Sequence, residues 1–128
     1  MYEYRIKSVD RIVDGDTIDV TLDLGFDIHH KTRVRLYGIN TPEKRTRDLE
    51  EKKRGYAASE RLTELLRSES TTDESRSDII LKTKEKGKYG RYLGVIYRKR
   101  KDDEIRFNIN QQLVIEGHAV EYFGGKRK

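Results

Sequence analysis

Hydrophobic and polar residues alternate with a period of two in the first third of the chain. In TIDVTLDL, residues 17–24, every second residue from Ile18 onward is apolar and the residues between are polar or charged. Because successive side chains of a strand point to opposite faces, this stretch predicts a half-buried strand. Further strands are expected over 2–9 and 33–36, where the same period recurs more briefly.

Short connections separate these strands. VDGDT, residues 13–17, predicts a tight turn, because glycine readily adopts left-handed and turn backbone angles. Residues 25–31, which include two adjacent histidines, are expected to link the second strand to the third. The three strands should therefore follow one another through short turns.

The apolar period changes after the only proline of the chain, Pro42. From Ala58 onward apolar residues recur at i, i+4, i+7 and i+8, which predicts an amphipathic helix over about 48–67. The stretch that follows, 68–77, contains no apolar side chain and predicts a loop.

Strand character returns over 79–83 and again over 92–97. A second, shorter helix fits NINQQLVIEG, residues 108–117. Asn110 is expected to cap this helix, because an asparagine side chain can accept hydrogen bonds from the first free N–H groups. Gly117 is expected to end it, since glycine is favoured just past the end of a helix.

The predicted order is strand, strand, strand, helix, strand, strand, helix. This order indicates an α+β fold, mainly β, in which five strands form a Greek-key OB-fold barrel. One helix would follow the third strand, and a short helix would lie near the C-terminus. We expect a single domain over residues 1–123 and a frayed basic tail over 124–128.

Charge and composition narrow the setting. Charged residues make up 40% of the chain and the net charge is +5, which suits a polyanionic partner such as nucleic acid. Without cysteine, the chain has no disulfide, thiolate metal site or cysteine nucleophile. We expect no membrane partner and an intracellular location for the chain as written, since it contains no spanning apolar run and no signal-peptide core. Secretion stays open if a leader has been removed.

Polar residues that suit phosphate chemistry gather at three predicted strand ends. The clusters are Asp14, Asp16 and Thr17; Arg35, Asn40, Thr41 and Glu43; and Lys88, Tyr89 and Arg91. Hydrolysis of a phosphodiester needs oxygen ligands for a hard cation, positive donors around the phosphate, and a carboxylate that orients or deprotonates water. Pro42 biases Thr41 toward an extended conformation, which leaves the Thr41 carbonyl outside any helix. Each cluster alone is more typical of a turn, a helix start or a solvated hairpin than of a catalytic site.

Together, three motifs in this order and spacing resemble the staphylococcal nuclease (thermonuclease) family. They are VDGDT at 13–17, RLYGINTPE at 35–43 and KYGR at 88–91, and the resemblance extends from about Val9 to Phe123. It implies the barrel fold, one Ca²⁺ ion, and a sugar-non-specific endonuclease that hydrolyses DNA and RNA at the bond to the 5′ oxygen, giving 3′-phosphate ends. We expect a monomer that acts on single-stranded or locally melted nucleic acid.

The resemblance also implies roles at the reaction centre. Arg35 and Arg91 would clamp the phosphate, and Glu43 would orient or deprotonate the attacking water. The side chains of Asp16 and Asn40 would bind the metal, together with the backbone carbonyl of Thr41.

Four further positions carry over to the surroundings of that centre. Asp14 would stand behind the metal ligands as an additional carboxylate. Lys88 and Tyr89 would contact the terminal phosphate of a bound nucleotide. Tyr122, near the end of the matching region, would stand in for a tyrosine that stacks on a base.

Asn40 departs from the best-known family pattern, which has aspartate there. One metal ligand thus keeps its oxygen but loses its charge, which predicts weaker calcium binding. Two alternatives therefore stay open: a barrel that holds single strands without cutting them, and a protein-interaction domain on the same fold. Glu43 favours the enzyme, because a carboxylate facing phosphate would only repel it in a pure binder.

Overall fold

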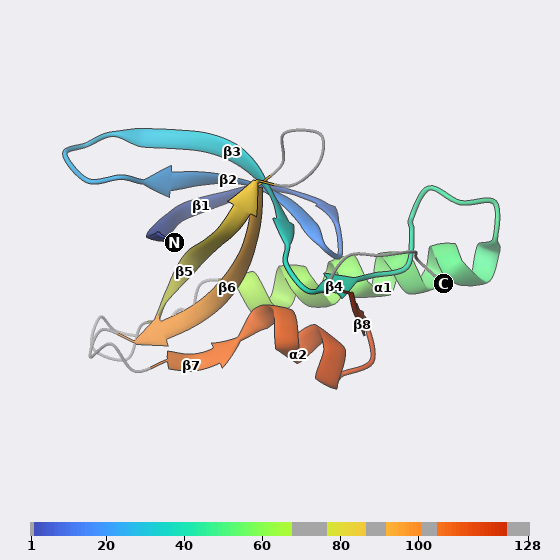
Figure 1. The fold of residues 1–128 in the computed structure, drawn as a ribbon. Coiled ribbons are helices and arrows are strands. Elements are labelled where there is room, and N and C mark those ends of the chain that lie inside the picture. Colours follow the sequence, from blue (N-terminus) through green and yellow to red (C-terminus); the bar gives the residue numbers. More distant parts are fainter. Residues whose placement is uncertain (1, 68–76, 87–91, 101–104, 123–128) are drawn as a thin grey trace.

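The computed structural model describes residues 2–67, 77–86, 92–100 and 105–122. Its elements, in chain order, are β1 (Glu3–Asp14), β2 (Thr17–Asp23), β3 (His29–Leu36), β4 (Ile39–Asn40), α1 (Leu49–Leu66), β5 (Ser77–Lys86), β6 (Tyr92–Arg100), β7 (Ile105–Asn108), α2 (Ile109–Ile115) and β8 (Val120–Glu121). Figure 1 shows the strands curving over the two helices. Within the described ranges, neither helix is long and apolar enough to cross a membrane.

Five strands close into a barrel. They pair in the order β3-β2-β1-β5-β6, and β3 returns to β6 in parallel, with Val34 opposite Tyr92 and Leu36 opposite Gly94. β7 pairs with the later part of β6, at residues 97–99, and β4 pairs with β8 in a small separate sheet. The fold is therefore α+β, mainly β, with a five-stranded OB-fold barrel and two helices, as the sequence predicted.

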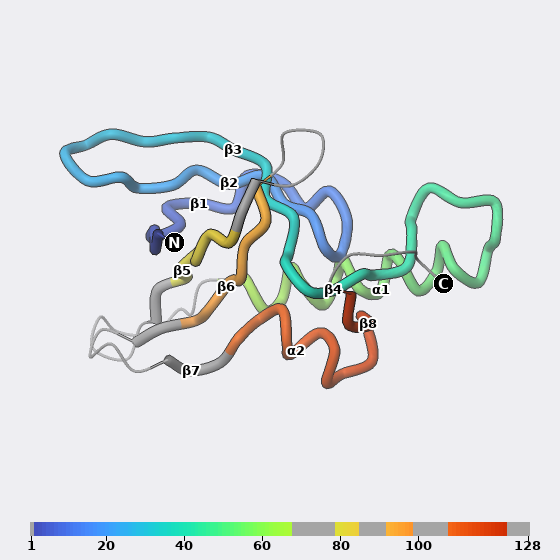
Figure 2. Tube along the Cα trace, viewed as in Figure 1, coloured from blue at the N-terminus to red at the C-terminus, as the bar shows by residue number. Residues whose placement is uncertain are grey.

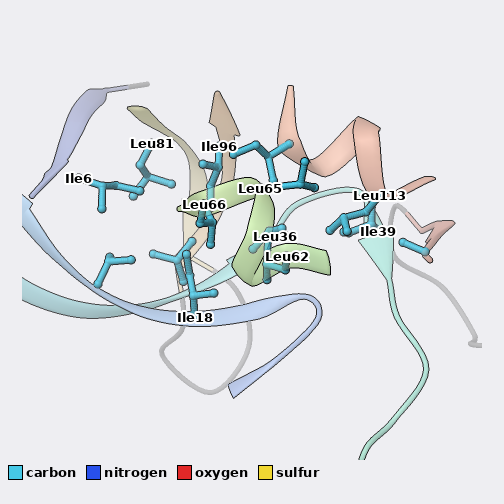
Figure 3. Close-up of a cluster of buried hydrophobic side chains, with 14 of the residues drawn as sticks. Ile6, Ile18, Leu36, Ile39, Leu62, Leu65, Leu66, Leu81, Ile96 and Leu113 are labelled. Carbon is cyan, nitrogen blue, oxygen red and sulfur yellow. The ribbon is translucent and has the colours of Figure 1, made fainter. Parts of the chain in front are cut away.

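The barrel and α1 share one hydrophobic core. The apolar side of β2 points inward, and Ile18 and Val20 are fully buried. Leu62 of α1 is also fully buried, and Figure 3 shows it with Leu65 and Leu66 among the core side chains of the strands. The alternation and the helical period that predicted these elements thus mark the faces that the core covers.

Helix α1 begins and ends close to the predicted positions. Asp48 is the N-cap, and its Oδ1 accepts hydrogen bonds from the N–H groups of Glu50 (3.0 Å) and Glu51 (3.3 Å). The last turn has no basic residue of its own. Instead the buried Arg98 of β6 donates to the carbonyl oxygens of Leu65 (2.6 Å) and Arg67 (2.8 Å). A tertiary contact thus satisfies carbonyls that the end of a helix leaves open.

Two strand boundaries differ from the prediction. β1 continues to Asp14, because its pairing with β2 persists to that residue. Three register shifts break the two-residue alternation, so the sequence pattern shows only the first part of the strand. β3 begins at His29, so the expected link over 25–31 is wrong. His29 pairs with Asp23 of β2, and the hairpin is closed by a hydrogen bond from Leu24 N to Ile28 O of 2.9 Å. The predicted loop over 68–77 lies outside the described residues except for position 77, where β5 begins.

The predicted cap of α2 is also wrong. Asn108 is the N-cap, and its Oδ1 accepts from Gln111 N at 3.0 Å. Asn110 lies inside the helix with its side chain buried, so it serves a tertiary role instead. Gly117 has a φ of +82° just after the helix, as expected for the residue that ends it.

Asn110 connects three elements. Its Oδ1 accepts from Ile96 N of β6 (3.2 Å), and its Nδ2 donates to Gly94 O (3.1 Å) and to Tyr37 O (2.9 Å). Tyr37 follows β3 directly, in the connection that leads to β4. Asn110 thereby holds the exit of β3 against β6 and α2.

An ion pair joins the two helices. Arg61 of α1 donates from Nη2 to Glu116 Oε2 at 2.9 Å, and Gln112 donates to the same oxygen at 2.7 Å. The Arg61 guanidinium, with help from Gln112, lowers the pKa of Glu116 from 4.5 to about 2. The folded protein therefore favours the ionised carboxylate. Glu116 stabilises the fold fully at every pH at which this carboxyl group is also ionised in the unfolded chain.

Glu116→Gln is expected to reduce the free energy of unfolding by about 1 kcal/mol at neutral pH, the upper range for a partly exposed ion pair. Because the folded pKa lies below the unfolded one, the difference from wild type should shrink as pH falls from 4.5 to about 2. Urea denaturation of both proteins at several pH values measures this. Glu60→Gln, an exposed change on α1, is the control, and a Glu116→Gln effect independent of pH would contradict the prediction.

Candidate functional site

The structure brings the first two sequence clusters together at one end of the β2–β3 pair. Thr17 at the start of β2 lies opposite Arg35 near the end of β3. Leu36 N donates to Asp16 O at 2.7 Å, so the β1–β2 turn is bonded to the end of β3. Asp16 therefore lies next to the segment that carries Asn40 and Thr41.

Asp16 organises this segment through its carboxylate. Its Oδ2 accepts from Thr41 N at 3.1 Å, and its Oδ1 accepts from the Thr17 hydroxyl at 3.0 Å. The first of these bonds holds Thr41 beside the turn, although 25 positions separate the two residues in the chain. The side chain of Asp16 and the backbone of Thr41, two of the predicted metal ligands, are thus adjacent.

Arg35 lies between the two predicted side-chain ligands. Its Nη2 donates to Asn40 Oδ1 and lies 3.6 Å from Asp16 Oδ2, and its Nη1 donates to Ile39 O at 3.1 Å. The Arg35 side chain is only 18% exposed and that of Asp16 only 13%. These contacts fix the guanidinium plane, and a guanidinium binds an oxyanion through the N–H groups along one edge of that plane.

The end of the described chain completes the wall beside Arg35. β4 pairs with β8, with Asn40 opposite Val120, and Tyr122 N donates to Gly38 O at 2.8 Å. The ring of Tyr122 lies 6.0 Å from Arg35 Cζ, in the range of a cation–π contact. The predicted substrate residue Tyr122 is therefore next to the predicted phosphate clamp.

Acidic side chains surround the turn. Burial raises the pKa of Asp14, the nearby Asp16 carboxylate raises it further and Glu43 adds to the effect, while Lys44 and Arg45 act in the opposite direction. Glu43 itself is exposed. The turn thus gathers three carboxylates, of which Glu43 is the most exposed, and Lys44 and Arg45 lie near Asp14.

The donor set fits a hard cation in kind. Asp16, Asn40 and the Thr41 carbonyl offer oxygen atoms, which calcium and magnesium prefer. Both side-chain oxygens also contact the Arg35 guanidinium, with which a cation would have to share them. Only Asp16 brings a formal charge. Across the described ranges, no three carboxylate, histidine or cysteine side chains gather as a metal-holding group. A divalent ion would therefore depend on uncharged ligands and water for most of its coordination.

The third sequence cluster, Lys88, Tyr89 and Arg91, lies outside the described residues. The described strand that follows it, β6, starts at Tyr92 opposite Val34, and Leu93 pairs with Arg35. Arg33, two residues before Arg35 on the same strand, is bound to Asp19 through Nε (2.7 Å) and Nη2 (3.1 Å). It is an exposed cation paired on the barrel wall and takes no part in the Asp16–Arg35 contacts.

The glycine of the β1–β2 turn has a different role from the one predicted. Gly15 does not have a left-handed backbone conformation. A Cβ atom there would lie 2.8 Å from Ala58 Cβ and 3.0 Å from Thr41 Cγ2, so the residue is small because α1 and Thr41 approach it. A Cβ atom on Gly55 of α1 would lie even closer to its neighbour, 2.6 Å from the carbonyl oxygen of Glu43. A glycine inside an amphipathic helix was the only sequence signal of this second contact.

An OB-fold barrel with an arginine, carboxylates and oxygen donors at the ends of its strands defines a nuclease-like or nucleic-acid-binding module. The sequence model of the staphylococcal nuclease homologue family matches residues 33–128, so the chain belongs to this family. A comparison with curated proteins found no match. The matched region contains Arg35, Asn40, Thr41 and Glu43. Asp14 and Asp16 precede this region, and the pairing of β1 with β2 and of β2 with β3 brings them to the site.

Proposed function

We propose that this protein is a calcium-dependent nuclease that hydrolyses phosphodiester bonds of DNA and RNA. The observation that supports this most is the fixed position of Arg35 between Asp16 and Asn40, with Glu43 three residues beyond Asn40. An oriented guanidinium, with an exposed carboxylate on the segment that follows Asn40, is a combination that binding alone does not require. Family membership supports nuclease chemistry and a nucleic acid substrate.

In the proposed reaction, Arg35 binds two oxygens of the scissile phosphate with its planar fork and gains strength as charge develops there. Arg91 completes this clamp. Glu43 orients a water molecule and accepts its proton as the water attacks phosphorus, and the 5′ oxygen leaves. Asp16, Asn40 and the Thr41 carbonyl would hold a calcium ion, which would supply further positive charge at the phosphate.

Contacts beyond the reacting phosphate would hold the substrate. Tyr122, beside Arg35, offers a ring face on which an unpaired base can stack. Lys88 and Tyr89 would contact the terminal phosphate. Because stacking requires unpaired bases, we propose single-stranded or locally melted substrates. We also propose that the protein acts as a monomer.

Cleavage at the 5′ oxygen leaves a phosphate on the 3′ end of each upstream product. A single-stranded oligonucleotide labelled at its 5′ end tests this, since phosphatase treatment should slow the products in a sequencing gel by removing charge. Products with free 3′ hydroxyls would be insensitive to the treatment and would contradict the proposed bond cleavage.

One observation favours a second candidate, a module that binds single strands without cutting them. Asn40 supplies no charge to a cation, and its Oδ1 accepts a hydrogen bond from Arg35. If this contact outcompetes a divalent ion, the barrel retains a positive surface without hydrolysis. Fluorescence anisotropy with a labelled single strand, in chelator and in calcium, would then show salt-sensitive binding and intact strands in both.

Asn40→Asp is expected to raise calcium affinity, because the new carboxylate adds a formal negative charge to the ligand set. The gain should be about 1 to 3 kcal/mol in binding free energy. Isothermal titration calorimetry with calcium measures it directly. Asp19→Asn, which changes charge on β2 at the Arg33 ion pair, is the control. Unchanged affinity in Asn40→Asp would exclude position 40 from the metal site.

A further inference from the structure

Helix α1 contains a single glycine, Gly55, and the backbone of Glu43 lies directly against it. A Cβ atom on Gly55 would lie 2.6 Å from the carbonyl oxygen of Glu43, 2.7 Å from its carbonyl carbon and 2.9 Å from Lys44 N. Each of these three atoms belongs to the main chain, which cannot rotate away as the end of a side chain can. The helix and the 43–44 segment therefore touch main chain to main chain.

Helix formation does not require glycine at position 55. Glycine is the least favourable residue after proline inside a helix, and Gly55 lies in the second turn of α1 without left-handed backbone angles. Its backbone conformation is open to any residue. What the missing side chain supplies is space for the backbone of Glu43.

The same segment has further contacts with the helix. Lys44 Nζ lies 5.2 Å from the centre of the Tyr56 ring, next to Gly55. One turn later, Ala58 lies at the close approach between Gly15 and Thr41 described above. Figure 2 shows the chain leaving β4, running alongside α1 and then turning back into its first turn. The helix thus borders the segment from Thr41 to Lys44.

The geometry points to Gly55 as a positioning residue for Glu43, an inference that rests on the nuclease function proposed above. Thr41 is held by the Asp16 carboxylate through its N–H, and Glu43 is held by the bare backbone of α1. Pro42 between them restricts the remaining freedom. With both ends held, the backbone that carries the Glu43 carboxylate keeps its place relative to the Asp16–Arg35 contacts.

Gly55→Ala tests this with the smallest possible side chain. The methyl group must displace the Glu43 backbone, and misplacement of a catalytic group by about 1 Å can cost about 100-fold in rate. We expect kcat to fall by about 10-fold or more, with KM little changed because Arg35 and Tyr122 keep their places. Ala57→Gly, an exposed change at the next-but-one position of the helix, is the control and should retain wild-type kcat.

A double-mutant cycle separates positioning from a general effect on the fold. If Gly55 acts only through Glu43, Gly55→Ala should have no further effect on the residual rate of Glu43→Ala. Equal fractional losses in both backgrounds would overturn the inference, and so would an unchanged kcat in Gly55→Ala alone. If the wild type cleaves nothing, the nuclease function fails and the inference with it. If the wild type cleaves and only the results expected for Gly55→Ala are not found, the proposed nuclease function is kept and the inference about Gly55 is rejected.

A second variant applies if Gly55→Ala does not fold, as circular dichroism would show. Tyr56 is 51% exposed, so Tyr56→Ala removes the ring beneath Lys44 without opening the core. The inference predicts a several-fold loss of kcat that is absent in the Glu43→Ala background, and recovery in Tyr56→Phe, which retains the ring. Wild-type kcat in Tyr56→Ala would overturn the inference.

Discussion

Arg35→Ala is expected to lower kcat/KM for cleavage of DNA and RNA by about 100-fold or more, the usual cost of removing a charged contact to the transition state. The structure holds this guanidinium in place through Asn40 Oδ1 and the carbonyl oxygen of Ile39. Arg35→Lys retains the charge but loses the planar fork. It should recover only part of the activity.

Arg33→Ala provides a matched control for this prediction. Arg33 lies two residues earlier on β3, shares the outward face with Arg35, and is bound to Asp19. Removing it changes net charge by the same amount and leaves the site intact. Similar rates for the two alanine variants would show that general positive charge, and not the Arg35 site, supports the reaction.

Asn110→Ala is expected to reduce the free energy of unfolding by about 3 kcal/mol, since the change leaves buried polar groups without partners. The N–H of Ile96 and the carbonyl oxygen of Tyr37 would lose bonds of 3.2 and 2.9 Å inside the protein. Urea denaturation followed by circular dichroism measures the loss. Asn110→Asp should also destabilise, because a carboxylate would face carbonyl oxygens in place of the amide donor.

Asn108→Ala is the natural comparison, because it removes the cap of the same helix. A lost N-cap costs about 1 kcal/mol, so the two asparagines should differ clearly in effect. A larger loss in Asn108→Ala than in Asn110→Ala would contradict the tertiary role assigned to Asn110. Weaker attachment of Tyr37 should also loosen the exit of β3, so activity is expected to fall at temperatures where Asn110→Ala is still folded.

Local periodicity was sufficient for the long elements. The alternation in β2 and the helical period of α1 are repeated over several turns or residues, and burial of one face decides both. β4 and β8 have two residues each, too few to show a period, and they exist only because they pair with each other. The start of β3 was missed because His29 is placed by pairing with Asp23, not by its own hydropathy.

The candidate site was predictable from motifs, but its internal contacts were not. Order and spacing identified Asp16, Arg35, Asn40, Thr41 and Glu43 as one group. The bond from Thr41 N to Asp16 joins residues on two separate turns, and it follows from barrel closure. The same holds for Gly15 and Gly55, whose role is to leave space for a neighbour that the sequence does not show. Asn110 was mistaken for a cap because its local context favours one, while its partners lie on β6 and after β3.

The most direct test is cleavage of denatured DNA and of RNA by the purified protein, with calcium and with a chelator, beside Glu43→Ala. The site described here predicts that calcium supports cutting of both polymers, that the chelator abolishes it, and that Glu43→Ala loses about 100-fold or more of the rate. Binding without cutting in calcium, or equal cutting by Glu43→Ala, would contradict it.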